Sequence, residues 1–185
     1  MLYNTHMIEK HPFGYFVPKK TTYLVLGSFT TKEAYDKTKR DDYVWFYSNG
    51  GRNQFWPILS EVYDRELLTR RQMEILFTDL QMALGDIITQ CERKRNSNLD
   101  ITLTNIEYGV KEVDEILANN SIKKIYFTSR FVEQKYKSNF KSVIEHHPEI
   151  ELITLPSPSP RYVLMTKHEK LTKYRQLLPQ LEKYI

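Results

Sequence analysis

Three short apolar runs stand out from an otherwise polar chain, and each is continuous rather than alternating. They are YLVLGSF at 23–29, KKIYFTS at 123–129 and ELITLPS at 151–157. Continuous apolar runs of this length predict strands of a sheet that is covered on both faces, because such strands bury every side chain. A fourth strand is predicted at QMALGDII, 81–88, where Gly85 interrupts the pattern.

The segments between these runs change to the period of a helix. After Asn53 the apolar residues follow one face of a helix at Phe55, Ile58, Leu59, Val62 and Tyr63. Similar stripes predict helices within 110–118, 131–144 and 166–178, the last of which ends before Pro179. Strands that alternate with helices predict a parallel four-stranded sheet in an α/β fold, with right-handed crossovers and helices on both faces.

Length and composition favour one globular domain over residues 1–185, since the chain has no internal repeat or linker and 41% of its residues are apolar. The single Cys91 excludes a disulfide framework and a four-cysteine metal site. No apolar run approaches the roughly 20 residues that span a bilayer, and residues 1–13 lack a signal-peptide core. We therefore expect a cytoplasmic protein that does not bind membranes.

The positive charge lies near the end of the chain. The net charge is +4, and residues 161–185 contain six Lys or Arg against two Asp or Glu. This distribution is compatible with phosphate binding, because each phosphate that is neutralised releases a counterion. The alternative is a lysine-rich helix face in water. The run Glu92–Arg95 is interpreted as a solvated loop.

Ligands of open parallel sheets bind beyond the carboxyl ends of the strands, which selects four loops: 27–53, 86–105, 128–131 and 156–165. In the first loop Asn53 is predicted to accept a hydrogen bond from an N–H at the start of the next helix, with Pro57 in its first turn. Gly50 and Gly51 fit either a turn with positive φ or the close approach of a ligand.

The last loop, LPSPSPRY at 155–162, is stiffened by three prolines and offers the hydroxyls of Ser157 and Ser159 beside Arg161. Such a loop suits contact with a phosphate backbone, and the alternative is a plain turn into the last helix. No phosphate-binding Gly-Lys-Ser/Thr loop, dinucleotide-binding glycine motif or nucleophile elbow occurs. His146-His147-Pro148 is interpreted as a charged helix end rather than a metal site.

Five motifs occur in the order and spacing of one enzyme superfamily. They are HPF at 11–13, LGSF at 26–29, FY…GGRNQFW at 46–56, GDIITQC at 85–91 and LPSPSP at 155–160. Over about residues 11–178 the chain resembles the uracil-DNA glycosylase superfamily, and within it the deoxyinosine (hypoxanthine)-DNA glycosylase branch. The resemblance implies a three-layer α/β/α sandwich and an enzyme that flips a deaminated base out of DNA and hydrolyses its N-glycosidic bond.

The resemblance also assigns roles to residues. Phe29 stands where the superfamily usually has the Asp or Asn that positions the attacking water, so this role passes to Asn53 and Phe29 is expected to contact the base. Phe46, or second Tyr47, is expected to stack on the base. Asp86 is expected to read the base edge, unless it is an exposed residue at a strand end.

The expected DNA contacts are Gly27, Ser28, Gly50, Gly51, Ser157, Ser159 and Arg161. The resemblance implies a monomer that acts on duplex DNA containing hypoxanthine or uracil and uses no cofactor and no metal. Leu155 replaces a polar residue that many relatives use to stabilise the departing base. Two alternatives therefore remain: a DNA-binding member without catalysis, and a protein that binds free nucleobases or nucleosides.

Overall fold

The computed structural model describes residues 8–35, 44–48, 52–93 and 97–181, and its centre is a parallel sheet of four strands. These are β2 (Tyr23–Gly27), β3 (Met82–Asp86), β6 (Lys124–Phe127) and β7 (Glu151–Thr154), in the order β3-β2-β6-β7. The parallel four-stranded sheet predicted from the apolar runs is confirmed. Each strand is shorter than its run; β7, for example, ends at Thr154, before the buried Leu155.

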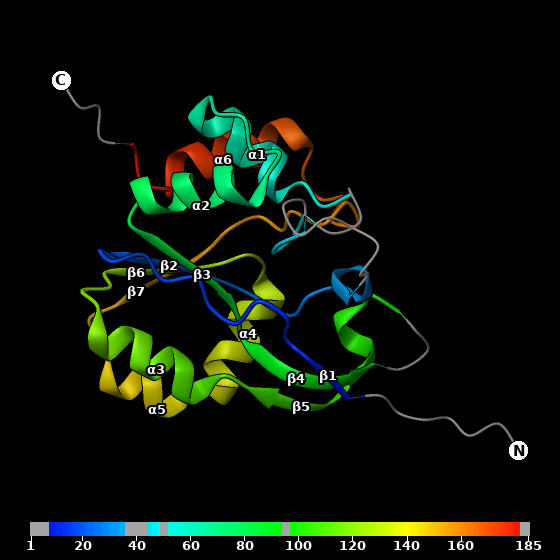
Figure 1. The fold of residues 1–185 in the computed structure, drawn as a ribbon, viewed down its shortest axis with the longest axis vertical. Helices are drawn as coiled ribbons and strands as arrows, with labels where there is room; N and C mark the ends of the chain where they lie inside the picture. The colour runs from blue at the N-terminus through cyan, green and yellow to red at the C-terminus, as the bar shows by residue number, and fades with distance from the viewer. Residues whose placement is uncertain (1–7, 36–43, 49–51, 94–96, 182–185) are drawn as a thin grey trace, which may run out of the picture.

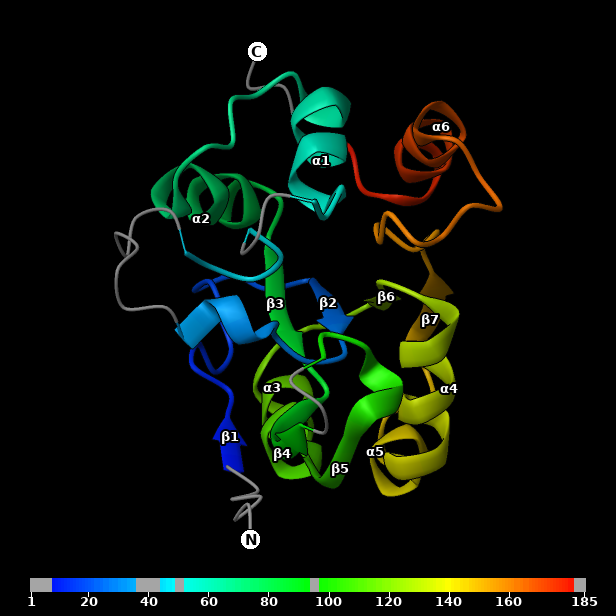
Figure 2. The ribbon, with the colours of Figure 1, turned by 90° about the vertical axis from the view of Figure 1, so that its right-hand side faces the viewer.

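Six helices in the described ranges cover the two faces of this sheet (Figures 1 and 2). One layer contains α1 (Phe55–Tyr63), α2 (Arg70–Asp79) and α6 (Lys167–Leu177). The other contains α3 (Val110–Asn119), α4 (Arg130–Asn139) and α5 (Lys141–His146). The architecture is therefore a mixed α/β fold compatible with three α/β/α layers.

Two helix predictions need correction. The helix expected over 131–144 is broken at Phe140, whose buried side chain and non-helical backbone separate α4 from α5. Helix α2 was not predicted, although Thr69 and Gln72 form a capping box at its start. Its buried residues Met73, Leu76 and Phe77 also fall at helical spacing, so the sequence contained the signal for this helix.

A second sheet was also not predicted. It is antiparallel, with the order β1-β4-β5, and consists of β1 (Ile8–Lys10), β4 (Ile88–Arg93) and β5 (Leu103–Tyr108). The predicted strand 81–88 in fact divides at Ile87, where the chain passes from the parallel sheet into β4. Irregular pairing between β4 and β5 and many polar residues hid both strands in the sequence.

Alternate residues of the parallel strands enter two separate cores. Leu24 and Leu26 of β2 pack in the cluster that includes α3, α4 and α5, while Val25 between them packs in the cluster of α1, α2 and α6. Both faces of the strand are buried, which is why its apolar run is continuous. None of the helices in the described residues is long and apolar enough to cross a membrane.

The connections diverge between β2 and β6. From β2 the chain crosses to β3 through α1 and α2 on one face, whereas from β6 it crosses to β7 through α4 and α5 on the other face (Figure 2). The loops that leave the carboxyl ends of these strands therefore separate, and such a switch point is where open α/β sheets bind ligands.

Candidate functional site

A cavity of about 740 Å³ lies at the carboxyl ends of the parallel strands. Its walls come from the segments after β2, β3, β6 and β7 and from the segment before α1. The predicted site residues that line it are Ser28, Phe29, Tyr47, Asn53, Asp86, Ser157, Ser159 and Arg161. Gly50 and Gly51 lie outside the described residues.

Asn53 is fixed at the start of α1. Its Oδ1 accepts a hydrogen bond of 2.9 Å from the backbone N–H of Phe55, as the sequence predicted, although Gln54 occupies the N-cap position itself. The backbone N–H of Gln54 donates to the carbonyl of Pro158 at 2.9 Å. The side chain of Asn53 lines the cavity, and the hydrogen bond from Gln54 to Pro158 connects its segment to the last loop.

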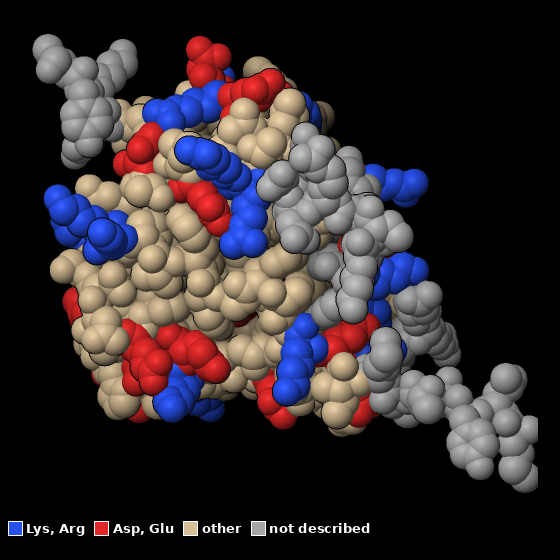
Figure 3. All heavy atoms as spheres, in the orientation of Figure 1, with Lys and Arg blue, Asp and Glu red and all other residues tan. Residues whose placement is uncertain are grey.

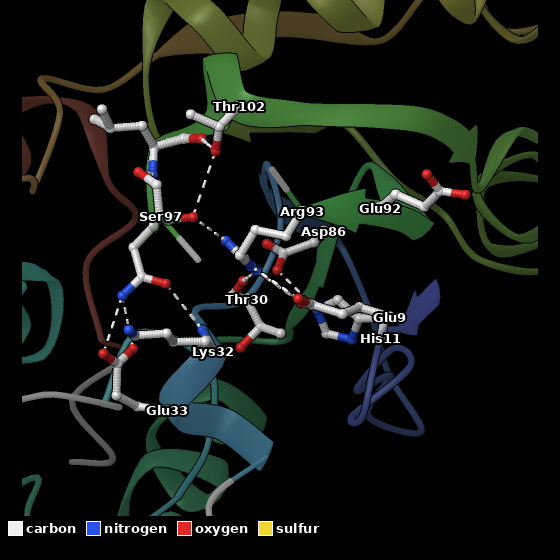
Figure 4. Close-up of polar contacts among 12 residues, drawn as sticks. Glu9, His11, Thr30, Lys32, Glu33, Asp86, Glu92, Arg93, Ser97 and Thr102 are labelled. Carbon is white, nitrogen blue, oxygen red and sulfur yellow. Dashed lines mark hydrogen bonds and ion pairs between the residues drawn. The ribbon is translucent and has the colours of Figure 1, made fainter. Parts of the chain in front are cut away.

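Asp86 ends β3 and is only 3% exposed, so the alternative of an exposed strand-end residue is wrong. Its Oδ2 lies 2.8 Å from Nε2 of His11 (Figure 4). Its Oδ1 accepts a 2.9 Å hydrogen bond from the hydroxyl of Tyr47. The hydroxyl of Tyr15 donates to the backbone carbonyl of Asp86 at 2.9 Å. These contacts hold the carboxyl group in one orientation at the cavity wall.

Tyr47 remains a phenol in this setting. Burial, and then the charge of Asp86, raise the pKa of Tyr47 well above its ordinary value. Gly27 lies beside Tyr47 and has a steric reason to be glycine, because a Cβ at this position would lie 1.9 Å from the Tyr47 hydroxyl oxygen. The structure thus relates Gly27 to the hydrogen bond between Tyr47 and Asp86, and its predicted contact with DNA remains a prediction.

The two candidate stacking rings occupy different places. Phe46 is 1% exposed, stacks on the ring of His11 at a centroid distance of 5.3 Å and does not line the cavity. Phe29 and Tyr47 do line it. The structure therefore favours Tyr47, the second candidate, and Phe29 over Phe46 as the aromatic surfaces that a ligand in the cavity would meet.

The last loop contributes hydroxyls and a cation. The backbone N–H of Ser159 donates to Oγ of Ser157 at 3.3 Å, and the N–H of Arg161 donates to Oγ of Ser159 at 3.2 Å. The loop is therefore held by its own serines, and the side chain of Arg161 is exposed at the cavity. Leu155 is buried in the core and offers no polar group.

Asp100 also lines the cavity and was not predicted. Burial is the main reason that its pKa rises to about 6, and the charge of Asp86 adds to this, while a hydrogen bond from Ser28 and the charges of Arg93 and Arg161 act in the opposite direction. The loop 86–105 was selected by the position rule for parallel sheets, but no motif within it marked Asp100.

Arg93 was expected in a solvated loop, yet its side chain is only 4% exposed. Its guanidinium binds both carboxylate oxygens of Glu9 at 2.9–3.1 Å and donates to the carbonyls of Thr30 at 2.9 Å and Ser97 at 3.0 Å (Figure 4). It also lies over the ring of Phe29. Arg93 therefore joins the small sheet to the loop after β2, and the planar fork of an arginine suits this role.

Charges of both signs occur in small groups on the face shown in Figure 3. At the end of α5, ring nitrogens of His146 and His147 lie 3.5 Å and 3.2 Å from Oδ1 of Asp114 in α3. Among the residues that the structure describes, no cluster of three or more His, Cys, Asp or Glu side chains could hold a metal ion.

The chain matches no known protein-family model and no curated protein. The resemblance to uracil-DNA glycosylases therefore remains a prediction from the order of the motifs.

Proposed function

We propose that this protein is a monofunctional DNA glycosylase that hydrolyses the N-glycosidic bond of a deaminated base, hypoxanthine or uracil, flipped out of duplex DNA. The observation that supports it is the meeting of Asn53, Asp86 and the loop 157–161 in one cavity, although they are far apart in the sequence. Its volume of about 740 Å³ falls in the range of small-molecule sites, roughly 300–1,000 Å³.

In this proposal the flipped base lies against Phe29 and Tyr47, and Asp86 accepts a hydrogen bond from an N–H at the base edge. Contacts with His11 and Tyr47 already orient the carboxyl group of Asp86, so binding requires little rearrangement. The extrusion of a base costs a few kcal/mol, which stacking and backbone contacts from the loop 157–161 offset.

The bond from C1′ to the base breaks with its electron pair leaving on the base, and the oxygen of a water held by Asn53 bonds to C1′. The water loses one proton and the departing base gains one. Positive charge develops on the sugar, and the carboxyl groups of Asp86 and Asp100 in the same cavity favour it. With a pKa of about 6, Asp100 is ionised at neutral pH and accepts the proton of the water.

The test is incubation with duplexes that contain a single inosine, uracil or xanthine, followed by alkali to break the strand at abasic sites. We expect cleavage with at least one lesion, and no strand breaks with any of them would overturn the proposal. Asn53→Ala should lower the rate roughly 10²–10³-fold, because it removes an oriented polar group. Asn53→Asp should retain activity. Asn119→Ala, at the exposed end of α3, is the matched control.

A second candidate is a DNA-binding member of the same superfamily that does not cleave. Phe29 and Leu155 favour it, because the structure buries an apolar side chain at both places where related enzymes have a polar one. This candidate predicts affinity for mismatched or abasic DNA that falls with salt and with Arg161→Ala, without turnover.

A further inference from the structure

Lys170 is a buried lysine in the first turn of α6, with only 1% of its surface exposed. Its Nζ donates hydrogen bonds to Oε1 of Gln54 at 2.9 Å and to the backbone carbonyl of Ser159 at 3.2 Å, and it lies 5.3 Å from the centre of the Tyr162 ring. Within the described ranges, no Asp or Glu forms an ion pair with it. The partners that the structure describes, Gln54, Ser159 and Tyr162, are all neutral.

This arrangement is costly for a lysine. Burial disfavours the ammonium form and lowers the pKa of Lys170. A cation that is buried without a carboxylate costs free energy, whereas a methionine of similar length would fill the same space without that cost. Overall stability alone therefore does not explain Lys170, and its two hydrogen bonds need a separate explanation.

The hydrogen bonds connect two walls of the cavity. Gln54 directly follows Asn53, and Ser159 lies in the middle of the loop 157–161. The N–H of Gln54 also donates to the carbonyl of Pro158, and the hydroxyl of Tyr174, one turn after Lys170, donates to the carbonyl of Pro156 at 3.0 Å. Helix α6 thus binds this segment at two backbone carbonyls, those of Pro156 and Ser159. Lys170 itself does not line the cavity, so it does not touch a ligand there.

We propose that Lys170 is a positioning residue that fastens the loop 157–161 to the Asn53–Gln54 segment, so that Asn53 and the phosphate-contacting Ser157, Ser159 and Arg161 keep a fixed separation. The backbone carbonyl of Ser159 accepts the hydrogen bond from Lys170, while Ser157, Ser159 and Arg161 line the cavity. The identity of the ligand as DNA rests on the proposed function, but the connection between the two walls does not.

Three readouts on Lys170→Met test this role. We expect the thermal midpoint to stay the same or rise, because an uncompensated buried cation is removed. Amide hydrogen exchange of Gln54 should accelerate at least about 10-fold as its bond to Pro158 loosens. The single-turnover rate of base excision should fall about 10–10²-fold, because reacting groups lose their alignment. Lys173→Met, at an exposed position on the same helix, is the matched control.

Lys170→Arg, which keeps the charge and the donors, should recover part of the lost rate and slow the exchange of Gln54 again. Unchanged exchange and excision in Lys170→Met would overturn the proposal. So would a large fall in the midpoint with exchange accelerated equally in α3, since that pattern indicates general packing. If the wild type excises no base, the proposed function fails, while the exchange of Gln54 still tests the connection.

Discussion

Two cavities of this molecule differ in what lines them. The cavity at the carboxyl ends of the strands has a volume of about 740 Å³, and its lining includes carboxyl groups, hydroxyls, two side-chain amides and two arginines. A smaller cavity of about 140 Å³ lies between the edge of the parallel sheet and the helices α3, α4 and α5. Most of its lining is apolar: Leu117, Ile125, Tyr136, Val143, Ile144, His147, Pro148, Ile150 and Leu152.

The difference supports the large cavity as the ligand site of the proposed function. An apolar void next to a core follows from imperfect packing, and the lining side chains lose dispersion contacts there. The large cavity instead has walls that are fixed by buried polar contacts, namely Asp86 with His11 and Tyr47, and Thr30 with Arg93. Fixed polar groups around an open space are typical of a preorganised binding or catalytic site. Changes in the small cavity should therefore affect stability, and changes in the large one should affect function.

The largest effect on stability is expected from Ile125→Ala. Ile125 is almost fully buried in β6 and lines the small cavity, so truncation enlarges an existing void. The free energy of unfolding should fall by about 4 kcal/mol in urea titrations. Base excision per folded molecule should not change. Ile125→Val removes a single methylene and should cost only about 1 kcal/mol. Altered excision by the folded Ile125→Ala protein would break the distinction between the two cavities.

The parallel sheet could be predicted because its strands are buried on both faces, so that runs such as 23–29 are apolar throughout. The antiparallel sheet could not be, because β4 and β5 alternate irregularly and part of their stability comes from an ion pair distant in sequence, Arg93 with Glu9. Helix α2 had both a capping signal at Thr69 and Gln72 and buried residues at helical spacing, Met73, Leu76 and Phe77, so this helix could have been predicted.

Positions within the candidate site were predictable where a local rule applied. Asn53 precedes a helix and its hydrogen bond to the N–H of Phe55 follows from that place. Burial is a property of the whole fold, so the sequence could not distinguish Phe46, which packs behind His11, from Tyr47, which lines the cavity. Asp100 was not predicted as a site residue for the same reason, since its raised pKa depends on burial and on Asp86.

The next effect in size concerns Gly27, at the wall of the large cavity. Gly27→Ala places a methyl group on the Tyr47 hydroxyl and close to Oδ1 of Asp86. Relief of this overlap should break the hydrogen bond between them and cost about 3 kcal/mol of unfolding free energy. Excision should fall as well, because Asp86 loses one of its two orienting partners.

A double-mutant cycle gives the control for Gly27. In a Tyr47→Phe background the hydroxyl is absent, so Gly27→Ala should cost less than in the wild type. Equal costs in both backgrounds would show that the overlap with the hydroxyl is not the cause, and the glycine would then need another explanation, such as the predicted contact with DNA.

The smallest effect has the opposite sign and comes from Asp100→Asn. The folded pKa of about 6 lies above the ordinary 3.8, so the folded state binds more protons between about pH 4 and pH 6, and stability falls as the pH rises through that window. Asparagine does not ionise, so the variant should be more stable than the wild type at pH 7.5 by roughly 1–2 kcal/mol and nearly equal to it at pH 4.

The same substitution separates stability from function at the large cavity. If Asp100 accepts the proton of the attacking water, wild-type excision should rise with pH through about 6, and Asp100→Asn should lose that rise and be slower at pH 7.5. Asp64→Asn, at the exposed end of α1, should change neither property, with an effect on stability below about 0.5 kcal/mol. A variant that is both more stable and less active is what a strained functional group predicts. If Asp100→Asn is less stable than the wild type at pH 7.5, Asp100 has a structural role. The large cavity would then differ from the small cavity only in the polarity of its lining.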